Sequence, residues 1–359
     1  MTSVQVRPTA TRLHCLRPRV LAVAVVSLLL GCASALADPV ADFYSGKTVR
    51  IQVGFGPGGG YDIYARTLAR HMARYIPGNP SVIVQNMPGA GSLKVVNFLY
   101  GVAPKDGTVF GTFARGIVLE PLLGHSEGIQ FEAPKFNWIG SIANEVSVCA
   151  FTSASGIRTW QDMQTKSYAI GSSGGGADSD VFPTVLRNMF RLPLKLVSGY
   201  QGGGADLVLA MERNEIDGRC GWSWTSLLSQ HKRLYDSKSI NVVVQLALAK
   251  HEDLADVPLV TDLTNEPRQK AALKLIFSRQ NIARPFAAPP GVPEERVRAL
   301  RSAFDATMRD PDFFLEAKKL DLEVRPVSGG EVGRLLDELY ASPVDVVQLA
   351  TEVSRESPP

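Results

Sequence analysis

Three short apolar strands of this chain each run into a glycine-rich loop, and each loop opens an amphipathic helix. These loops span residues 54–62, 171–178 and 199–206. In open α/β sheets such loops follow the carboxyl ends of parallel strands, the edge where ligands bind. A helix start offers free N–H groups and the positive end of a dipole, and glycine lets the backbone approach a ligand. One such loop fits a simple tight turn equally well, but three together predict an α/β fold that binds a carboxylate or phosphate.

Strands and helices alternate along the chain from residue 48 onward. Apolar residues at period two and short apolar runs predict strands at 49–53, 82–85, 109–113, 146–151, 168–170, 195–197 and 216–220. Amphipathic spacing predicts helices from 92 and near 159–165, 181–190 and 206–213. An extended run at 282–288 is followed by helices and one further strand, at 322–324. We expect this tail to return to the first sheet.

This order of elements predicts two α/β lobes with a ligand cleft between them. Lobe 1 is expected to be discontinuous, comprising residues 38–141 and 284–359, and lobe 2 to comprise residues 142–283. The chain has 359 residues, which is more than one hydrophobic core usually organises, so two lobes are also the simplest account of its length.

Residues 1–37 have the pattern of a secretory signal peptide. Four arginines without an acid precede an apolar run at 20–30, which is shorter than the roughly 20 residues that a membrane-spanning helix needs. Cleavage after Ala37 would start the mature chain at Asp38. Residues 29–32 also resemble a lipobox, which would anchor the protein through Cys32. Because Leu30 fits that motif poorly, we favour an unanchored periplasmic protein.

Only Cys149 and Cys220 remain once the leader is removed. An oxidising compartment permits a disulfide between them, but both lie in apolar stretches where buried free thiols fit equally well. The net charge of +3 is small, and Lys and Arg are scattered among Asp and Glu, which argues against a nucleic-acid partner. The five histidines have no metal-ligand spacing, so no metal site is expected.

Several segments resemble one family, the substrate-binding proteins of tripartite tricarboxylate transporters (Bug/TctC type). The matching segments are 53–66 (VGFGPGGGYDIYAR), 84–92 (VQNMPGAGS), 104–108 (PKDGT), the loop from 171, 199–203 (GYQGG), 214–217 (NEID) and 286–293 (FAAPPGVP). The resemblance implies a two-lobed periplasmic binding protein (type II, Venus flytrap) that captures a small organic carboxylate. It would act as a monomer and deliver the ligand to a membrane permease, without cofactor or turnover. A dicarboxylate, a tricarboxylate and an aromatic acid are all compatible with the sequence.

In this family the three loops hold the ligand carboxylate, largely through main-chain groups. Carried over by position, the resemblance implies that the ligand-binding residues are Phe55, Gly59, Gly60, Tyr61, Asp62, Ser172, Ser173, Asp178, Tyr200, Gly202 and Gly203. The chain departs from most relatives at Tyr61, where they carry a smaller residue, and near Asp178, where many carry a histidine. These differences affect the far end of the ligand pocket.

Three further side chains have two interpretations each. Arg115 follows the strand at 109–113 and could bind a second carboxylate through both arms of its guanidinium, although a lone arginine is more often solvated. Trp222 and Trp224 flank a strand end and could stack on an aromatic ligand, but burial in the core is the more common role of such residues.

Two enzyme motifs also occur. Residues 54–59 satisfy G-x-G-x-x-G, yet the next strand ends in Gln85 and Asn86, without the acid that a dinucleotide ribose requires. Residues 171–175 satisfy G-x-S-x-G, which would make Ser173 the nucleophile of a secreted serine hydrolase with His231 or His251 as base. In a hydrolase the helix begins directly after the serine, whereas here more glycines intervene. A binding protein is therefore the favoured interpretation.

Overall fold

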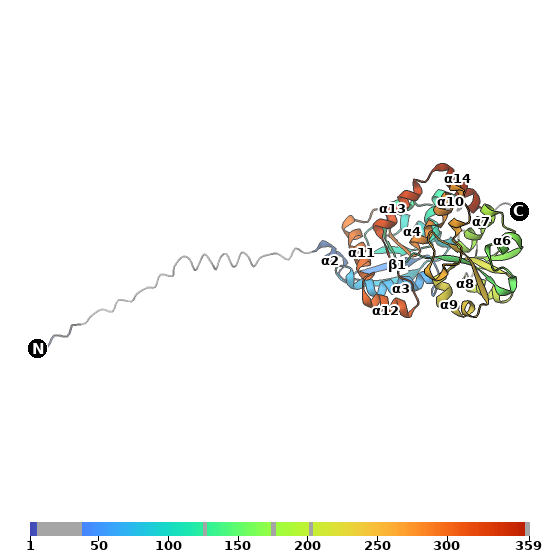
Figure 1. Ribbon diagram of the computed structural model, residues 1–359. Coiled ribbons are helices and arrows are strands. Elements are labelled where there is room, and N and C mark those ends of the chain that lie inside the picture. Colours follow the sequence, from blue (N-terminus) through green and yellow to red (C-terminus); the bar gives the residue numbers. More distant parts are fainter. Residues whose placement is uncertain (6–37, 125–127, 174–176, 201–203, 356–359) are drawn as a thin grey trace. The chain divides into compact units, whose positions relative to one another are not determined.

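The computed structural model describes residues 1–5, 38–124, 128–173, 177–200 and 204–355 (Figure 1). By its internal contacts the chain divides into two units, Met1–Pro39 and Val40–Pro359. The expected signal peptide falls mainly on residues 6–37, which include Cys32 and lie outside the described part of the chain. Every described strand belongs to the unit Val40–Pro359, which holds two separate sheets.

A six-stranded mixed sheet has the strand order β11-β4-β10-β3-β1-β2. Its strands are β1 (Thr48–Val53), β2 (Ser81–Asn86), β3 (Val109–Thr112), β4 (Asn137–Ser141), β10 (Pro285–Ala288) and β11 (Val327–Ser328). β1 pairs in parallel with β2 and β3, whereas β10 runs antiparallel to β3 and β4. Because β10 and β11 come from the last quarter of the chain, the tail returns to this sheet.

Helices pack on both faces of the six-stranded sheet. The helices of one face are α3 (Gly60–Met72), α11 (Glu294–Thr307) and α12 (Pro311–Lys319), and those of the other are α4 (Leu93–Gly101) and α13 (Gly329–Tyr340). Helix α3 forms as its sequence predicts, since Tyr64, Leu68 and Met72 recur at helical spacing and are buried. Its basic face contacts α12, where Arg70 forms an ion pair with Glu316.

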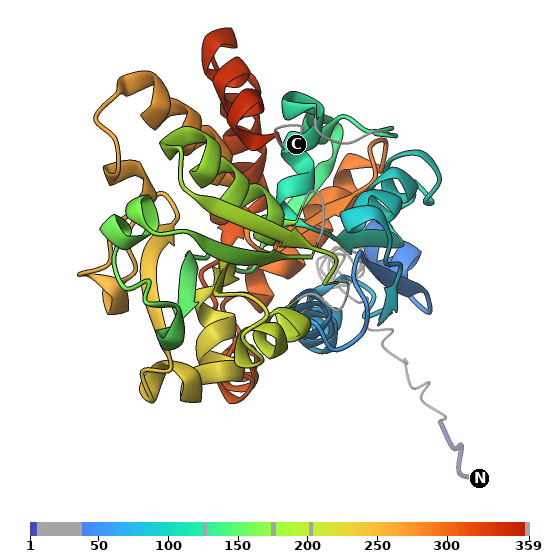
Figure 2. The same ribbon diagram turned by 90° about the vertical axis from the view of Figure 1, so that its right-hand side faces the viewer.

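A five-stranded mixed sheet has the order β7-β6-β8-β5-β9. Its strands are β5 (Ser147–Thr152), β6 (Tyr168–Ser172), β7 (Leu194–Ser198), β8 (Gly218–Ser223) and β9 (Ile240–Leu246). Helices α6 (Trp160–Thr165) and α7 (Asp178–Phe190) share their core with one face, and α8 (Gly204–Glu212) and α9 (Trp224–Asp236) with the other. Figure 2 shows the green and yellow strands of this sheet apart from the blue strands of the first.

The chain crosses between the two sheets twice. It leaves β4 at Ser141 and enters β5 at Ser147, and it returns through a 3-10 helix at Ser278–Ile282 into β10. Helix α10 (Pro267–Phe277) precedes the return, and the last helix, α14 (Val344–Ser354), packs against α10 and α7 (Figure 1). The chain terminus therefore contacts helices that follow the first crossing. The lobe boundaries expected from the sequence stay a prediction.

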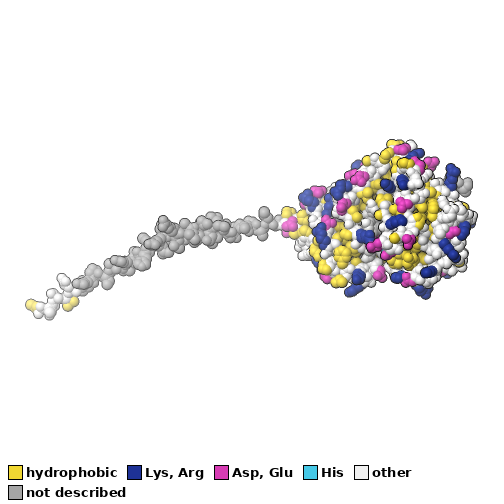
Figure 3. Space-filling view, viewed as in Figure 1, with side chains coloured by type: hydrophobic (Ala, Val, Ile, Leu, Met, Phe, Trp, Pro, Cys, Tyr) yellow, Lys and Arg dark blue, Asp and Glu magenta, His cyan; other side chains and the backbone are white. Residues whose placement is uncertain are grey.

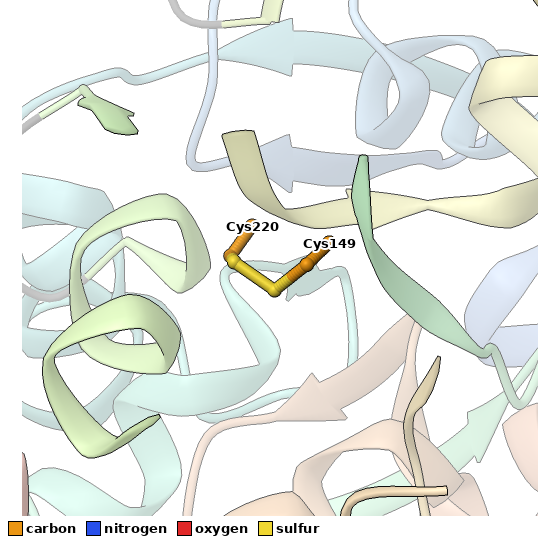
Figure 4. The surroundings of a disulfide bond; sticks show 2 residues. All are labelled: Cys149 and Cys220. Carbon is orange, nitrogen blue, oxygen red and sulfur yellow. A yellow bond between two sulfur atoms is a disulfide. The ribbon is translucent and has the colours of Figure 1, made fainter. Parts of the chain in front are cut away.

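Cys149 and Cys220 form a disulfide between the adjacent antiparallel strands β5 and β8 (Figure 4). Both side chains are fully buried. The register of the two strands shifts beside this bond, between Val148 and Ala150, and Gly221 takes a left-handed φ of +70° there. Of the two states that the sequence allows, the structure has the bonded one.

Two expected details are wrong. The segment 322–324 forms no strand, and this part of the tail joins the sheet only at β11, which pairs with β4. Helix α7 begins at Asp178, three residues before the predicted start. The sequence analysis also missed β4 and β9.

The surface carries charges of both signs. On the face in Figure 3, Lys and Arg side chains are interspersed with Asp and Glu. Within the described residues, no helix is long and apolar enough to cross a membrane. Among the same residues, no three His, Cys, Asp or Glu side chains are grouped so that they could hold a metal ion.

Candidate functional site

The first glycine-rich loop is held by the carboxylate of Asp62. This buried group accepts hydrogen bonds from the Gly58 N–H at 2.8 Å, from Arg66 Nε at 2.9 Å and from Asn86 Nδ2 at 2.8 Å. Burial alone would raise the pKa of Asp62, but the three hydrogen bonds together lower it below its usual value. Asp62 therefore fixes the loop that it follows, with its oxygens already occupied by partners from the loop, α3 and the end of β2.

Two aromatic rings of this loop pack together, and one of them contacts an arginine that follows the second crossing. The rings of Phe55 and Tyr61 stack with their centroids 4.5 Å apart, and the Arg284 guanidinium lies 4.7 Å from the Tyr61 ring. The Tyr61 hydroxyl accepts a hydrogen bond from the N–H of Arg115 at 3.0 Å. Burial raises the pKa of Tyr61, so its phenol stays protonated. Gly59 and Gly60 lie at the start of α3, between Phe55 and Tyr61 in the sequence.

The second loop follows β6 and opens α7. Ser172 is fully buried and donates to Asp180 Oδ1 at 2.7 Å. The hydroxyl of Ser173 lies 2.8 Å from the hydroxyl of Ser179, and this contact pairs it with another serine instead of a histidine. The geometry expected for a hydrolase nucleophile, a serine hydroxyl bonded to a histidine base, is therefore missing from the described contacts of Ser173.

The third loop is described only at its two ends. The Tyr200 N–H donates to the carbonyl of Ser172 at 3.3 Å, which ties this loop to the end of β6. Gly202 and Gly203, both expected to bind ligand, lie outside the described residues.

Arg115 is buried in the structure, so the solvated interpretation of this residue is wrong. Its guanidinium donates to Glu145 Oε2 at 2.8 Å, to Asp178 Oδ2 at 2.8 Å and to the Ser147 hydroxyl at 3.0 Å. Although burial disfavours the charge, the carboxylates of Asp178 and Glu145 raise the pKa of Arg115 above its ordinary value. We call each sheet with the helices packed on it one half of the fold. Arg115 follows β3 of the six-stranded sheet, and Asp178 begins α7, which packs on the five-stranded sheet. This ion pair therefore joins the two halves of the fold.

Two more buried arginines complete this group. Arg284 Nη2 lies 2.6 Å from Glu145 Oε1, and Arg279 Nη1 lies 3.7 Å from Asp178 Oδ1. We call Arg115, Arg279, Arg284, Glu145 and Asp178 the arginine cluster. Its members come from the end of β3, from both crossings and from the start of α7. The sequence analysis singled out Arg115 and Asp178 but missed the others, although two arginines in the apolar stretch 275–288 were a visible signal.

A cavity of about 110 Å³ lies beside the cluster, between α3 and α9. Its lining combines backbone and side chains from both halves of the fold, with Gly60, Tyr64, Glu145, Thr225, Arg284 and Leu322 among them. The space between the halves is therefore polar at its inner end, where Glu145 and Arg284 lie.

Arg219 is a buried cation outside the cluster. Its Nη1 donates to the Gly204 carbonyl at 3.0 Å, and its guanidinium lies 4.6 Å from the ring of Trp222. Burial lowers the pKa of Arg219 to about 9, and its Nε has no hydrogen-bond partner among the described residues. Trp222 and Trp224 are both buried in the core behind α8 and α9, which fits the core interpretation of these residues.

Comparisons with known proteins bear on this geometry. No family model matches the chain. A UPF0065 protein of Bordetella pertussis is 24% identical over 298 residues, which cover 81% of this chain and 84% of that protein. The structure of the periplasmic binding protein BugD aligns with a TM-score of 0.66 and 19% identity, over 86% of this chain and 98% of BugD.

A further solved structure, that of MatC from Rhodopseudomonas palustris with bound malate, aligns with a TM-score of 0.62 and 15% identity, over 86% of this chain and 99% of MatC. BugD is a periplasmic binding protein by its title, and the two mixed α/β sheets described above match the fold of both structures. The chain is thus similar in sequence to a UPF0065 protein and has the two-lobed α/β fold of the periplasmic binding protein BugD.

Proposed function

We propose that this protein is a periplasmic receptor that captures a small organic carboxylate and delivers it to a tripartite tricarboxylate-type membrane permease. The observation that carries the proposal is the buried Arg115 guanidinium, which joins the two halves of a two-lobed fold. Arginine is the side chain best suited to hold a carboxylate, because its planar guanidinium donates two parallel hydrogen bonds. In MatC, a structural neighbour, the bound molecule is malate, which is a carboxylate.

The glycine-rich loops would supply the remaining contacts. The first loop precedes α3 and the second precedes α7, and each helix start favours an anion. Asp62 and Asn86 hold the first loop in place before a ligand arrives, which reduces the entropy lost on binding. We expect Gly59, Gly60, Ser172 and Ser173 to contact the ligand through main-chain or hydroxyl groups.

Capture would work by closure of the two halves around the ligand. The two crossings are the segments about which the halves could move, and a ligand that contacts both halves favours the closed form. The permease would then recognise the closed receptor. In this proposal the protein binds and releases its ligand unchanged, and the expected location is the periplasm.

The test is a thermal-shift panel on the chain from Asp38, refolded to remove any bound ligand. Mono-, di- and tricarboxylic acids and aromatic acids are compared with amines and neutral sugars. Ligand at a hundred times its dissociation constant should stabilise the protein by about 2.7 kcal/mol. Arg115→Lys keeps the charge but loses the second hydrogen bond, so it should weaken binding about tenfold, a loss of about 1.4 kcal/mol. Arg74→Lys, on the surface, is the matched control, and a panel without any response to acids would contradict the proposal.

A further inference from the structure

We propose that Arg115 and Arg279 form an anion-binding subsite at the start of α7, and that the Asp178 carboxylate occupies this subsite until a carboxylate of the ligand replaces it. This inference rests on the proposed function, because the replacing group belongs to the captured solute. It assigns a role to Arg279 and gives Asp178 the role of a competitor for the site, not of a ligand contact.

The position of Asp178 is that of a bound anion. It is the first residue of α7, a helix of 13 residues, so its carboxylate lies where the helix dipole favours negative charge. Arg115 approaches it with two nitrogens, Nε at 2.8 Å and Nη2 at 2.6 Å from Oδ2. Arg279 approaches its other oxygen, with Nη1 3.7 Å from Oδ1. A ligand carboxylate placed here would meet the same two guanidinium groups.

The guanidinium of Arg279 has hydrogen-bond donors without acceptors. Its side chain is fully buried, and its Nε donates to the Ile276 carbonyl at 3.0 Å. Neither Nη1 nor Nη2 has a hydrogen-bond partner among the described residues, and the 3.7 Å separation from Asp178 is too long to supply one. Buried donors without acceptors are costly, so an acceptor that reaches closer than Asp178 does would stabilise this site. A free carboxylate is not tethered to α7 and can approach both arginines.

The two acids of the cluster differ in their freedom to leave it. The Glu145 side chain is 1% exposed and is shared by Arg115 and Arg284, whereas that of Asp178 is 17% exposed. Asp178 can therefore turn toward solvent while Glu145 stays. The negative charge of Glu120 also favours the charged form of Arg279. Because one carboxylate replaces another, the exchange leaves the charge balance of the cluster unchanged, which is the condition for burying the ligand's charge at low cost.

The first experiment uses acetate as the probe and the thermal midpoint of unfolding as the readout. Asp178→Asn removes the internal carboxylate and leaves both arginines without it. In this variant acetate should raise the midpoint above its value in chloride of equal ionic strength. In the wild type and in Asp312→Asn, a surface control, the two salts should act alike. The double variant Asp178→Asn/Arg279→Met should lose the response to acetate. Should Asp178→Asn not fold in chloride, the yield of folded protein on refolding in acetate is measured instead.

The second experiment measures the affinity of Asp178→Asn for the acid that the ligand panel identifies. Removal of a competitor should tighten binding about tenfold, and Arg279→Met should weaken it. Weaker binding by Asp178→Asn would overturn the inference, since it would make Asp178 a ligand contact, and so would an equal response of this variant to acetate and chloride. If no acid binds the wild type, the proposed function fails, but the acetate response of Asp178→Asn still decides whether the subsite accepts a carboxylate.

Discussion

The backbone of Gly221 lies directly against Asp178, so close that a Cβ added at Gly221 would come within 2.6 Å of the Asp178 carbonyl oxygen. Gly221 adopts a φ of +70° at the irregularity where β8 passes β5. Only glycine offers both the left-handed backbone and the missing side chain. This contact packs the start of α7, and with it the backbone of Asp178, against β8.

We therefore expect Gly221→Ala to destabilise the protein and to weaken ligand binding. The left-handed conformation alone costs an alanine about 1 kcal/mol, and the clash with Asp178 adds to that cost. Gly156→Ala is the matched control, because Gly156 has a φ of +72° with nothing within 4 Å of an added Cβ. Chemical denaturation of Gly156→Ala measures the cost of the left-handed backbone alone, whereas that of Gly221→Ala measures this cost together with the clash against Asp178. Equal losses of stability would show that the contact with Asp178 is unimportant.

The disulfide should stabilise the fold measurably. Cys149 and Cys220 are 71 residues apart in sequence, and closing a loop of this size lowers the entropy of the unfolded chain by an amount worth about 4 kcal/mol. The double variant Cys149→Ala/Cys220→Ala should unfold at a clearly lower denaturant concentration than the wild type, and reductant should shift the wild type in the same direction. Reductant should leave the double variant unaffected. Coinciding unfolding curves for the oxidised wild type and the double variant would contradict this expectation.

Arg219→Met should raise the stability of the protein. The guanidinium is buried over Trp222 with one described hydrogen bond, to the Gly204 carbonyl, and burial lowers the pKa of Arg219 to about 9, which reflects the cost of its charge there. Methionine keeps an apolar stem over the ring and removes that cost, a change we expect to stabilise by about 1 kcal/mol. Arg219→Lys keeps the charge and should not stabilise. A lower thermal midpoint for Arg219→Met would mean that the hydrogen bond to Gly204 outweighs the cost of burial.

Asp62 should make part of the stability depend on pH. Its pKa is lowered in the folded protein, so its contribution is present above the unfolded value of 3.8 and is lost as the pH falls through the folded value. Asp62→Asn should therefore cost stability at neutral pH and converge with the wild type in acid. Asp312→Asn, at an exposed position, is the control and should run parallel to the wild type. Unfolding midpoints measured from neutral to acidic pH test this, and a constant offset for Asp62→Asn would refute it.

The strands and glycine-rich loops were predictable from sequence because their signals are local. Alternation at Val49, Ile51 and Val53 and the glycines that follow fix β1 and the start of α3 without reference to the rest of the chain. The segment 322–324 has the same alternation but forms no strand. Leu322 and Val324 pack on the core of the first sheet without pairing to a strand, and apolar spacing cannot distinguish this arrangement from a strand.

The arginine cluster could not be found from local patterns. The surroundings of Arg115 depend on Glu145, Asp178 and Arg279, which lie 30 to 164 residues further along the chain. A single arginine after a strand is usually solvated, and only the folded chain brings the acids that allow it to be buried. The beginning of α7 at Asp178 was missed for a related reason, since the residue belongs to the glycine-rich loop by composition and to the helix by conformation.

Helix α14 completes a core whose other residues are synthesised before it. The largest core contains residues from Val95 to Val353, and α14 contributes Val346, Ala350 and Val353 to it. A chain still growing on the ribosome lacks these side chains, so the core shared by α7 and α10 stays incomplete until α14 has been synthesised.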